Sequence, residues 1–422
     1  MRFAKDMILQ CRNHRTRTRQ RVDSLALAIL FTTSLVTLQP GAIRAEPVEG
    51  ATDQNLASSR FEEMGVGWLP STPLEITAGV EMGYDDNATL APSGEGSLFA
   101  GENVVLTYNR AGEATQFYGV GIGRFDQYFN VSRNDVDGNV TMSLTHKFST
   151  RLSFYASVFA AYQTAPNFRS NVGPENVVSD HFYTSDIFSL TYHWFPRFSM
   201  ITSYTFNLVK YAQASIGNSQ DRVDNILGEQ FQFSLTSRTD LVGEYRLEMI
   251  NYDTAPNNSM THYLLAGFNH HLTEHLIFHL RAGESFRSLQ NDGDLANPYF
   301  ESSLGYVSSN HSLNWTTSYD FEASTASGVT TTKTWRTGLI LTYGLTSRIS
   351  STTGVYYHHD ENTGGTGSTG TQNSFDLTLG LRYTINKHFA LHLDYNHTTL
   401  GSFGSTPGYS ENRYFGGLTY TY

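Results

Sequence analysis

The sequence contains one cysteine, Cys11, and no long apolar run beyond residue 45. A single cysteine cannot build a disulfide framework, and without cysteine ligands a thiolate metal centre is excluded as well. Without an apolar stretch of ~20 residues, the chain after residue 45 cannot cross a membrane as helices. Gly-rich phosphate loops and dinucleotide-binding fingerprints are also missing. We therefore expect no bound cofactor and no metal.

The first 45 residues have the order of a secretory signal peptide. A basic region up to Arg21 precedes an apolar run from Leu25 to Leu38, and small residues follow up to Ala45. The run is short for a membrane-spanning helix of ~20 residues, so we expect cleavage after Ala45. An uncleaved anchor is the alternative, because the basic region is unusually long. This gives three parts: a signal peptide (1–45), a periplasmic N-terminal lead (46–72) and a folded domain (73–422).

Charge limits the partners of the exported chain. Removing residues 1–45 takes away eight Lys/Arg and two Asp/Glu, which leaves 20 basic side chains against 37 acidic ones and a net charge near −17. Phosphate binding needs clustered Lys and Arg, so nucleic acid is not an expected partner.

From residue 73 onward, apolar and polar residues alternate in segment after segment. In the first segment Leu74, Ile76 and Val80 interleave with Glu75 and Glu81, and the stretches 313–321 and 388–396 repeat the pattern. Successive side chains of a strand point to opposite faces. Each segment therefore predicts a strand with one apolar and one polar face.

Two kinds of connection join the segments. Short polar turns recur just before Arg151, Arg197, Arg238, Glu274, Asn310, Arg348 and Lys387, spaced 36 to 46 residues apart. That spacing corresponds to one hairpin per repeat. Longer Gly/Asn/Ser/Asp-rich stretches lie between them, at 85–101, 164–180, 218–221 and 362–371. Tight turns at one rim and long loops at the other are typical of outer-membrane barrels.

The alternating segments begin near residues 74, 102, 115, 139, 151, 182, 197, 225, 240, 259, 275, 298, 311, 332, 348, 372, 387 and 412. Most are long enough for a tilted strand, which needs ~9–11 residues to cross the bilayer. An even count lets the first and last strands pair. The predicted fold is all-β: a transmembrane antiparallel up-and-down β-barrel of about 18 strands (16–20 accepted).

A soluble sandwich or propeller is the alternative all-β interpretation. Against it, aromatic residues of the apolar face often lie near strand ends, where the interfacial girdles of a barrel would be. They are Tyr84, Tyr108, Trp194, Trp315, Tyr343, Tyr383, Tyr420 and Tyr422. The sequence also stops on an aromatic residue in mid-strand, which favours the barrel.

The last eight residues, Phe415-Gly-Gly-Leu-Thr-Tyr-Thr-Tyr422, resemble the C-terminal signal that the barrel assembly machinery recognises in bacterial outer-membrane proteins. Phe415, Gly417, Tyr420 and Tyr422 would carry that signal, with Phe415 and Tyr422 departing from the usual residue types. The stretch from Glu75 to Asn87 and the repeated hairpins resemble β-barrel porins often associated with exopolysaccharide systems. The resemblance implies an outer-membrane barrel in a Gram-negative bacterium.

The polar faces would line the lumen, where charged side chains can sort solutes by size and sign. The pore-lining candidates are Glu75, Glu81, Glu244, Arg246, Glu248, Asp320, Arg336, Asp376, Arg382, His392 and Asp394. The trio Glu244, Arg246 and Glu248 is the best local candidate. The alternative is that these charges only hydrate a wide pore or pair across strands.

Three further motifs have simpler interpretations. The stretch His358 to Asn362, at a predicted loop start, gathers metal-competent side chains, but neighbours on a strand face opposite ways and chelate poorly. Asp85 to Asn87 is expected to form a turn rather than to bind a cation. Asn269-His270-His271 lacks the oriented serine that a hydrolase needs, so no enzyme is predicted.

The combined expectation is a porin-like channel for passive diffusion of small polar solutes. A non-conducting structural barrel or an accessory of exopolysaccharide export is the alternative, and a barrel hydrolase is a weaker one. Residues 46–72 are too few for the folded plug of a TonB-dependent transporter. We expect both termini in the periplasm, with outer-membrane lipid, lipopolysaccharide and the assembly machinery as partners, and a homo-oligomer is compatible with this fold.

Overall fold

The computed structural model describes residues 73–164, 179–291, 293–323, 329, 331–363, 369–403 and 407–422. The expected signal peptide (1–45) and N-terminal lead (46–72) lie outside these residues. The described ranges contain 18 strands and one short helix, α3 (Ala214–Gln220). No helix within them is long and apolar enough to span a membrane.

The strands are 12 to 15 residues long and follow one another in a single antiparallel sheet. Their bounds are β1 (Leu74–Asp85), β2 (Ser97–Ala111), β3 (Thr115–Tyr128), β4 (Asn134–Lys147), β5 (Leu152–Gln163), β6 (His181–Phe195), β7 (Phe198–Tyr211), β8 (Arg222–Thr236), β9 (Thr239–Tyr252), β10 (Ser259–His271), β11 (Leu276–Leu289), β12 (Gly293–Val307), β13 (His311–Glu322), β14 (Thr331–Gly344), β15 (Ile349–Thr363), β16 (Gly370–Thr384), β17 (Phe389–Leu400) and β18 (Tyr409–Thr421).

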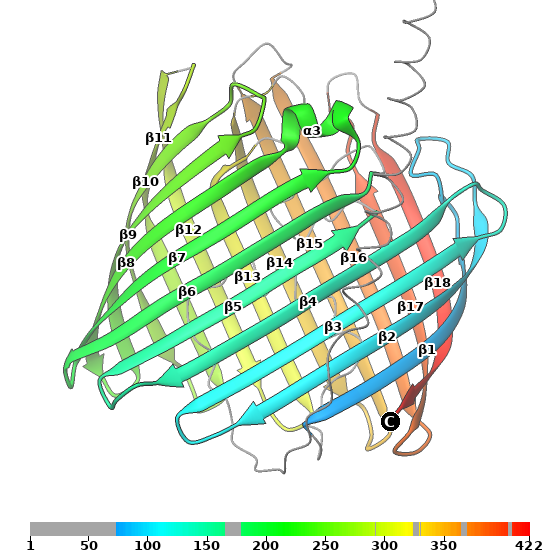
Figure 1. The fold of residues 1–422 in the computed structure, drawn as a ribbon, viewed down its shortest axis with the longest axis horizontal. Coiled ribbons are helices and arrows are strands. Elements are labelled where there is room, and N and C mark those ends of the chain that lie inside the picture. Colours follow the sequence, from blue (N-terminus) through cyan, green and yellow to red (C-terminus); the bar gives the residue numbers. More distant parts are fainter. Residues whose placement is uncertain are drawn as a thin grey trace, which may run out of the picture. The chain divides into compact units, whose positions relative to one another are not determined.

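The sheet closes on itself where the first strand meets the last. Thr77 to Asp85 of β1 pair antiparallel with Arg413 to Thr421 of β18, and β1 pairs on its other side with β2. In Figure 1 the blue end of the barrel lies directly beside the red end. Closure pairs the backbone N–H and C=O groups that an edge strand would leave without hydrogen bonds. Unpaired backbone groups are strongly destabilising in lipid, because no water is there to bond them. The predicted up-and-down barrel of 18 strands is confirmed.

The two rims differ, as the sequence predicts. Two residues join β6 to β7 (196–197) and β8 to β9 (237–238), whereas eleven residues (86–96) join β1 to β2. The C-terminus lies at the short-turn rim, and α3 lies at the opposite rim (Figure 1). The partly buried Ile216 of α3 packs against a cluster of inward-facing residues on β5, β6 and β7 that includes Phe159 and Val209. The predicted loop 218–221 therefore includes the end of a helix that covers part of the inner wall.

Each strand presents an apolar face outward and a polar face inward. On β1, Val80 and Met82 are 59% and 70% exposed, whereas Glu81 between them is 5% exposed. Buried Asn103, Thr107 and other polar residues line the inside in the same way. The alternation of the sequence is therefore the alternation between the outer and the inner surface of the barrel.

Three strands begin five residues earlier than predicted. β2 begins at Ser97 rather than at residue 102, β4 at Asn134 rather than 139, and β12 at Gly293 rather than 298. All three earlier starts lie at the long-loop rim, where backbone pairing continues: Ser97 lies opposite Asp85, and the apolar Leu98 and Phe99 that follow point to opposite faces. The sequence pattern identifies only the part of a strand in which polar and apolar residues alternate. Backbone pairing continues beyond that part to the rim of the barrel.

Candidate functional site

All eleven pore-lining candidates lie on strands, on the face turned to the barrel interior. On β9, for example, the outward Tyr245 is 40% exposed, while its neighbours Glu244 and Arg246 point inward and are engaged in ion pairs. The candidates are Glu75 and Glu81 on β1, Glu244, Arg246 and Glu248 on β9, Asp320 on β13, Arg336 on β14, Asp376 and Arg382 on β16, and His392 and Asp394 on β17. Their role in conduction stays a prediction.

The β9 trio belongs to a larger charged network on the inner wall. Arg246 donates hydrogen bonds to Glu244, to Glu301 Oε1 at 3.0 Å and to the hydroxyl of Tyr299 at 2.7 Å. Arg281 Nε lies 3.7 Å from the other carboxylate oxygen of Glu244. The network therefore connects β9 with β11 and β12, two strands that do not pair with β9 in the sheet.

Glu248 is held by a second arginine. Arg287 on β11 donates to Glu248 Oε2 at 3.1 Å and to Thr261 Oγ1 at 2.8 Å, while Tyr263 donates to the same glutamate oxygen at 2.8 Å. We call Glu244, Arg246, Glu248, Arg281, Arg287 and Glu301 the β9 cluster. It holds three carboxylates and three guanidinium groups, so its formal charges balance.

A second charged group lies where the barrel closes. Arg124 on β3 pairs with Glu81 and, at 2.9 Å, with Asp126 Oδ2, to which Arg413 of β18 also donates at 2.5 Å. The guanidinium of Arg413 stacks over the ring of Phe99 at 4.1 Å. We call Glu81, Arg124, Asp126 and Arg413 the seam cluster. It joins β1, β3 and β18 by side chains in addition to the backbone ladder.

The two clusters face each other across the lumen. In a closed ring of 18 strands β1 and β10 are nine strands apart in either direction. The seam cluster surrounds β1, and the β9 cluster surrounds β10 and β11. Two opposite sides of the inner wall therefore each carry both arginine and carboxylate.

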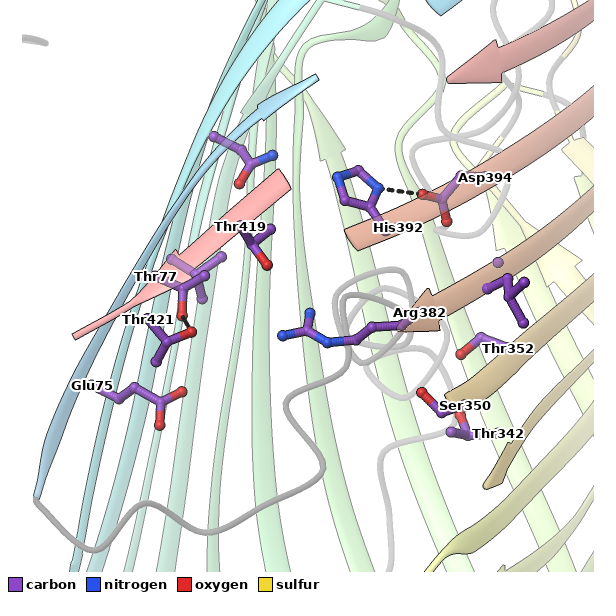
Figure 2. A pocket seen from close by; sticks show the side chains of 14 residues that line it. Glu75, Thr77, Thr342, Ser350, Thr352, Arg382, His392, Asp394, Thr419 and Thr421 are labelled. Carbon is purple, nitrogen blue, oxygen red and sulfur yellow. Dashed lines mark hydrogen bonds and ion pairs between the residues drawn. The ribbon is translucent and has the colours of Figure 1, made fainter. Parts of the chain in front are cut away.

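A cavity of about 80 Å³ lies nearer the short-turn rim, between β1, β2 and β14–β18. Figure 2 shows Arg382 pointing into it, between Glu75 and the pair formed by His392 and Asp394. His392 Nδ1 lies 2.6 Å from Asp394 Oδ2. Four of the eleven predicted candidates therefore meet in one cavity.

The family of this chain follows from its second half. Residues 198–422 match the model of the family described as "Putative beta-barrel porin 2". The chain belongs to this porin-like family. The match covers the strands from β7 to β18, which include the β9 cluster and the cavity wall on β14–β18. A porin-like barrel of this kind is an outer-membrane protein.

Solved structures that resemble the porin-like barrel have low sequence identity. The outer membrane protein OpdK from Pseudomonas aeruginosa is 11% identical, with a TM-score of 0.40 over 83% of this chain and 99% of the other. OccAB4 from Acinetobacter baumannii is 11% identical, with a TM-score of 0.38 over 83% and 99%. The siderophore receptor PirA from P. aeruginosa is 8% identical, with a TM-score of 0.40 over 84% and 81%. No curated protein matches the sequence.

The terminal segment of the porin-like barrel divides between the two surfaces. Tyr420 and Tyr422 are outward and exposed, whereas Phe415 turns inward and its ring lies 5.2 Å from the guanidinium carbon of Arg124. Gly417 lies under His392: a β-carbon at this position would be 2.5 Å from His392 Nε2. The predicted assembly role of these residues stays a prediction, and two of them also shape the lumen.

Two other sequence motifs, residues 358–362 and 85–87, form part of a strand and a turn in the porin-like barrel. The residues from His358 to Asn362 lie inside β15 and not at a loop start, because the strand continues to Thr363. His358 and Asp360 face inward 3.0 Å apart, and the described part of the chain contains no group of three side chains suited to hold a metal ion. Asn87 N donates to Asp85 Oδ1 at 2.9 Å, which forms the predicted turn.

Sequence reasoning missed six of the ten charged residues that form the two clusters. Arg124, Asp126, Arg281, Arg287, Glu301 and Arg413 were not among the candidates. The alternation could have found them, since Arg287 follows the outward Phe286 and Arg124 precedes the outward Phe125. Alternation indicates the surface on which a charge lies. It does not indicate which opposite charge that residue meets.

Proposed function

We propose that the protein is a channel of the bacterial outer membrane for the passive diffusion of small polar solutes. The observation that carries this proposal is a closed 18-stranded barrel with an apolar outside and a charged, hydroxyl-rich inner wall. Barrels of 16–18 strands are wide enough to leave an aqueous channel. Polar side chains on the inner wall would be costly in a dry interior, but water in a channel solvates them.

The two charged clusters support a mixed-charge lumen. Each contains arginine and carboxylate, so neither wall repels one sign of charge strongly. We expect a mild cation preference from the acidic excess of the exported chain, and this preference should fade as salt shortens the Debye length to ~3 Å at 1 M.

The proposed orientation places the short turns and both termini in the periplasm and the long loops outside. Residues 1–45 would be the export signal, and residues 46–72 would be a periplasmic lead. The apolar outer face would contact outer-membrane lipid and lipopolysaccharide. The last strand, with Phe415, Gly417, Tyr420 and Tyr422, would be read by the barrel assembly machinery.

Planar-bilayer recording tests the channel directly. Protein folded in detergent is first checked by a heat-modifiable gel shift and a β-type circular dichroism spectrum, because a closed barrel resists unfolding in the gel. Insertion into the bilayer should then give discrete conductance steps in KCl, and reversal potentials in a salt gradient report ion preference. Well-folded protein that inserts without conducting would contradict the proposal and favour a structural or export-accessory barrel.

A further inference from the structure

The loop that joins β1 to β2, residues 86–96, turns into the mouth of the barrel at the long-loop rim. Its Ala88 is fully buried and packs against Phe99 and Tyr128, whose ring centres lie 5.5 Å apart. Both rings belong to the inner face, because Leu98, which precedes Phe99, points outward and is 56% exposed. Ala88 therefore lies on the lumen side of β2 and β3.

The same loop makes a second contact on the other side of the barrel closure. Leu90 is buried and packs against Leu400 of β17 and Tyr409 of β18, which pair with each other in the β17–β18 ladder. Leu400 follows His392 by an even number of residues on the same strand, so both side chains belong to the inner face. The loop therefore spans the inner wall from β17 to β3, across the strands that close the barrel.

Hydrogen bonds fix the loop in this position. The side-chain amide of Asn87 donates to the carbonyl oxygens of Ala91 and of Ser410 on β18, both at 2.8 Å, and its own oxygen accepts from Ala91 N at 3.1 Å. Arg133, which follows β3, donates from Nη1 to the carbonyl oxygen of Ala88 at 2.6 Å. The loop is thus bonded to itself and to the inner wall on both sides of it.

The backbone of the loop is strained at Leu90. This residue has a φ of +50°, and among the residues that the structure describes it is the only one other than glycine with a positive φ. Such a conformation is rare for a residue with a β-carbon, and it persists only where the surrounding contacts hold it in place. Strain of this kind concentrates at functional sites, which points to a role for the loop beyond joining two strands.

We infer that residues 86–96 narrow the mouth of the lumen at the long-loop rim and so limit the size of the solutes that enter there. A layer of polypeptide packed on a sheet takes up about 10 Å, which the mouth loses in width on the side that the loop covers. One charge is present among the exposed residues of the loop, which are Thr89, Pro92, Ser93 and Glu95. The loop therefore selects by size rather than by charge. The inference rests on the proposed channel function, because a size limit acts only on solutes that pass.

Removal of the loop tests the inference. Deletion of residues 88–95 leaves Asp86, Asn87 and Gly96, a three-residue connection that ends in glycine, as β-hairpins favour. The gel shift shows whether the variant folds. Conductance is then measured in planar bilayers in KCl with polyethylene glycols of graded mass, which lower the current only if they enter the pore. We expect the deletion variant to conduct more than wild type and to admit larger polymers.

Two point substitutions in the loop give a matched comparison. Asn87→Ala removes the amide that bonds Ala91 and Ser410, so the polymer limit should move in the same direction as in the deletion variant. Ser93→Ala changes an exposed side chain of the same loop and should behave as wild type. The inference is wrong if the folded deletion variant keeps the conductance and the polymer limit of wild type. An equal shift in Ser93→Ala and Asn87→Ala would also contradict it, because the effect would then not depend on the docked position of the loop.

Failure of the channel itself is separable from failure of the inference about the loop. If the folded barrel does not conduct, the proposed function is wrong, and access to the mouth is then measured by thiol labelling of Leu400→Cys in detergent. Cys11→Ser removes the only native cysteine from this variant. Because Leu90 packs over position 400, thiol-reactive polyethylene glycols should label the variant with the deletion and leave the one with the full loop protected. Equal labelling of both would refute the inward position of the loop.

Discussion

Arg287 is a buried cation of the inner wall with five hydrogen bonds, and its removal has a calculable cost. The side chain is 1% exposed and donates to Glu248, Thr261, Thr331 and two main-chain carbonyl oxygens at 2.8–3.3 Å. Its guanidinium carbon also lies 5.0 Å from the ring centre of Phe321. Replacement by methionine, Arg287→Met, keeps most of the aliphatic volume and removes every donor.

The expected destabilisation is about 3–5 kcal/mol, the usual cost of leaving one partner of a buried ion pair uncompensated. Arg287→Lys should lose less, because it keeps the charge but not the fork of donors. Adding Glu248→Gln to Arg287→Met should recover part of the loss, since the stranded carboxylate is removed. A coupling of about 0.5–3 kcal/mol between the two positions would be typical of contacting residues.

The assay is urea unfolding in lipid vesicles, followed by tryptophan fluorescence and by the gel shift of the folded barrel. Arg197→Met is the matched control, since Arg197 is exposed in the two-residue turn between β6 and β7. We expect this control to stay within about 0.5 kcal/mol of wild type. A loss below about 1 kcal/mol for Arg287→Met would refute the reasoning, because it would mean that lumen water solvates the pair as it does at an open surface.

Three other changes test the lumen, the sheet and the end of the chain. The double substitution Glu244→Gln and Glu248→Gln leaves three guanidinium groups and one carboxylate in the β9 cluster. Reversal potentials at low salt should therefore show a shift of ion preference toward anions. An unchanged ion preference would show that this cluster does not set selectivity. Gly267→Ala should lower the free energy of unfolding by about 1–3 kcal/mol in the urea assay, because a β-carbon would lie 1.8 Å from a backbone carbonyl oxygen of β11. Gly243→Ala is the control: a β-carbon there would have no atom within 4 Å, so it should cause no steric destabilisation. Deleting Tyr422 should lower the fraction of heat-modifiable barrel in the outer membrane, and assembly at the wild-type level would contradict the terminal signal.

The sequence alone determines the strands and their two faces in this protein. Alternation of residue types is a local property with a period of two, so Val80, Glu81 and Met82 already show which side chain faces the lumen. Turn composition marks the hairpins, and the even number of strands brings the start of β1 and the end of β18 to one rim. The predicted starts of β2 and β12 were wrong, because the residues from Ser97 and from Gly293 onward do not alternate between polar and apolar as the rest of each strand does.

Only the tertiary structure decides which inward charges meet. Arg246 and Glu301 are on β9 and β12, and Asp126 and Arg413 come from opposite ends of the chain. Their contacts depend on the stagger of every strand against the next and on the closure of the sheet, which brings β18 back to β1. No local pattern contains that sum of registers. The sequence therefore predicts a charged lumen, while barrel closure decides that its charges form two balanced clusters on opposite walls.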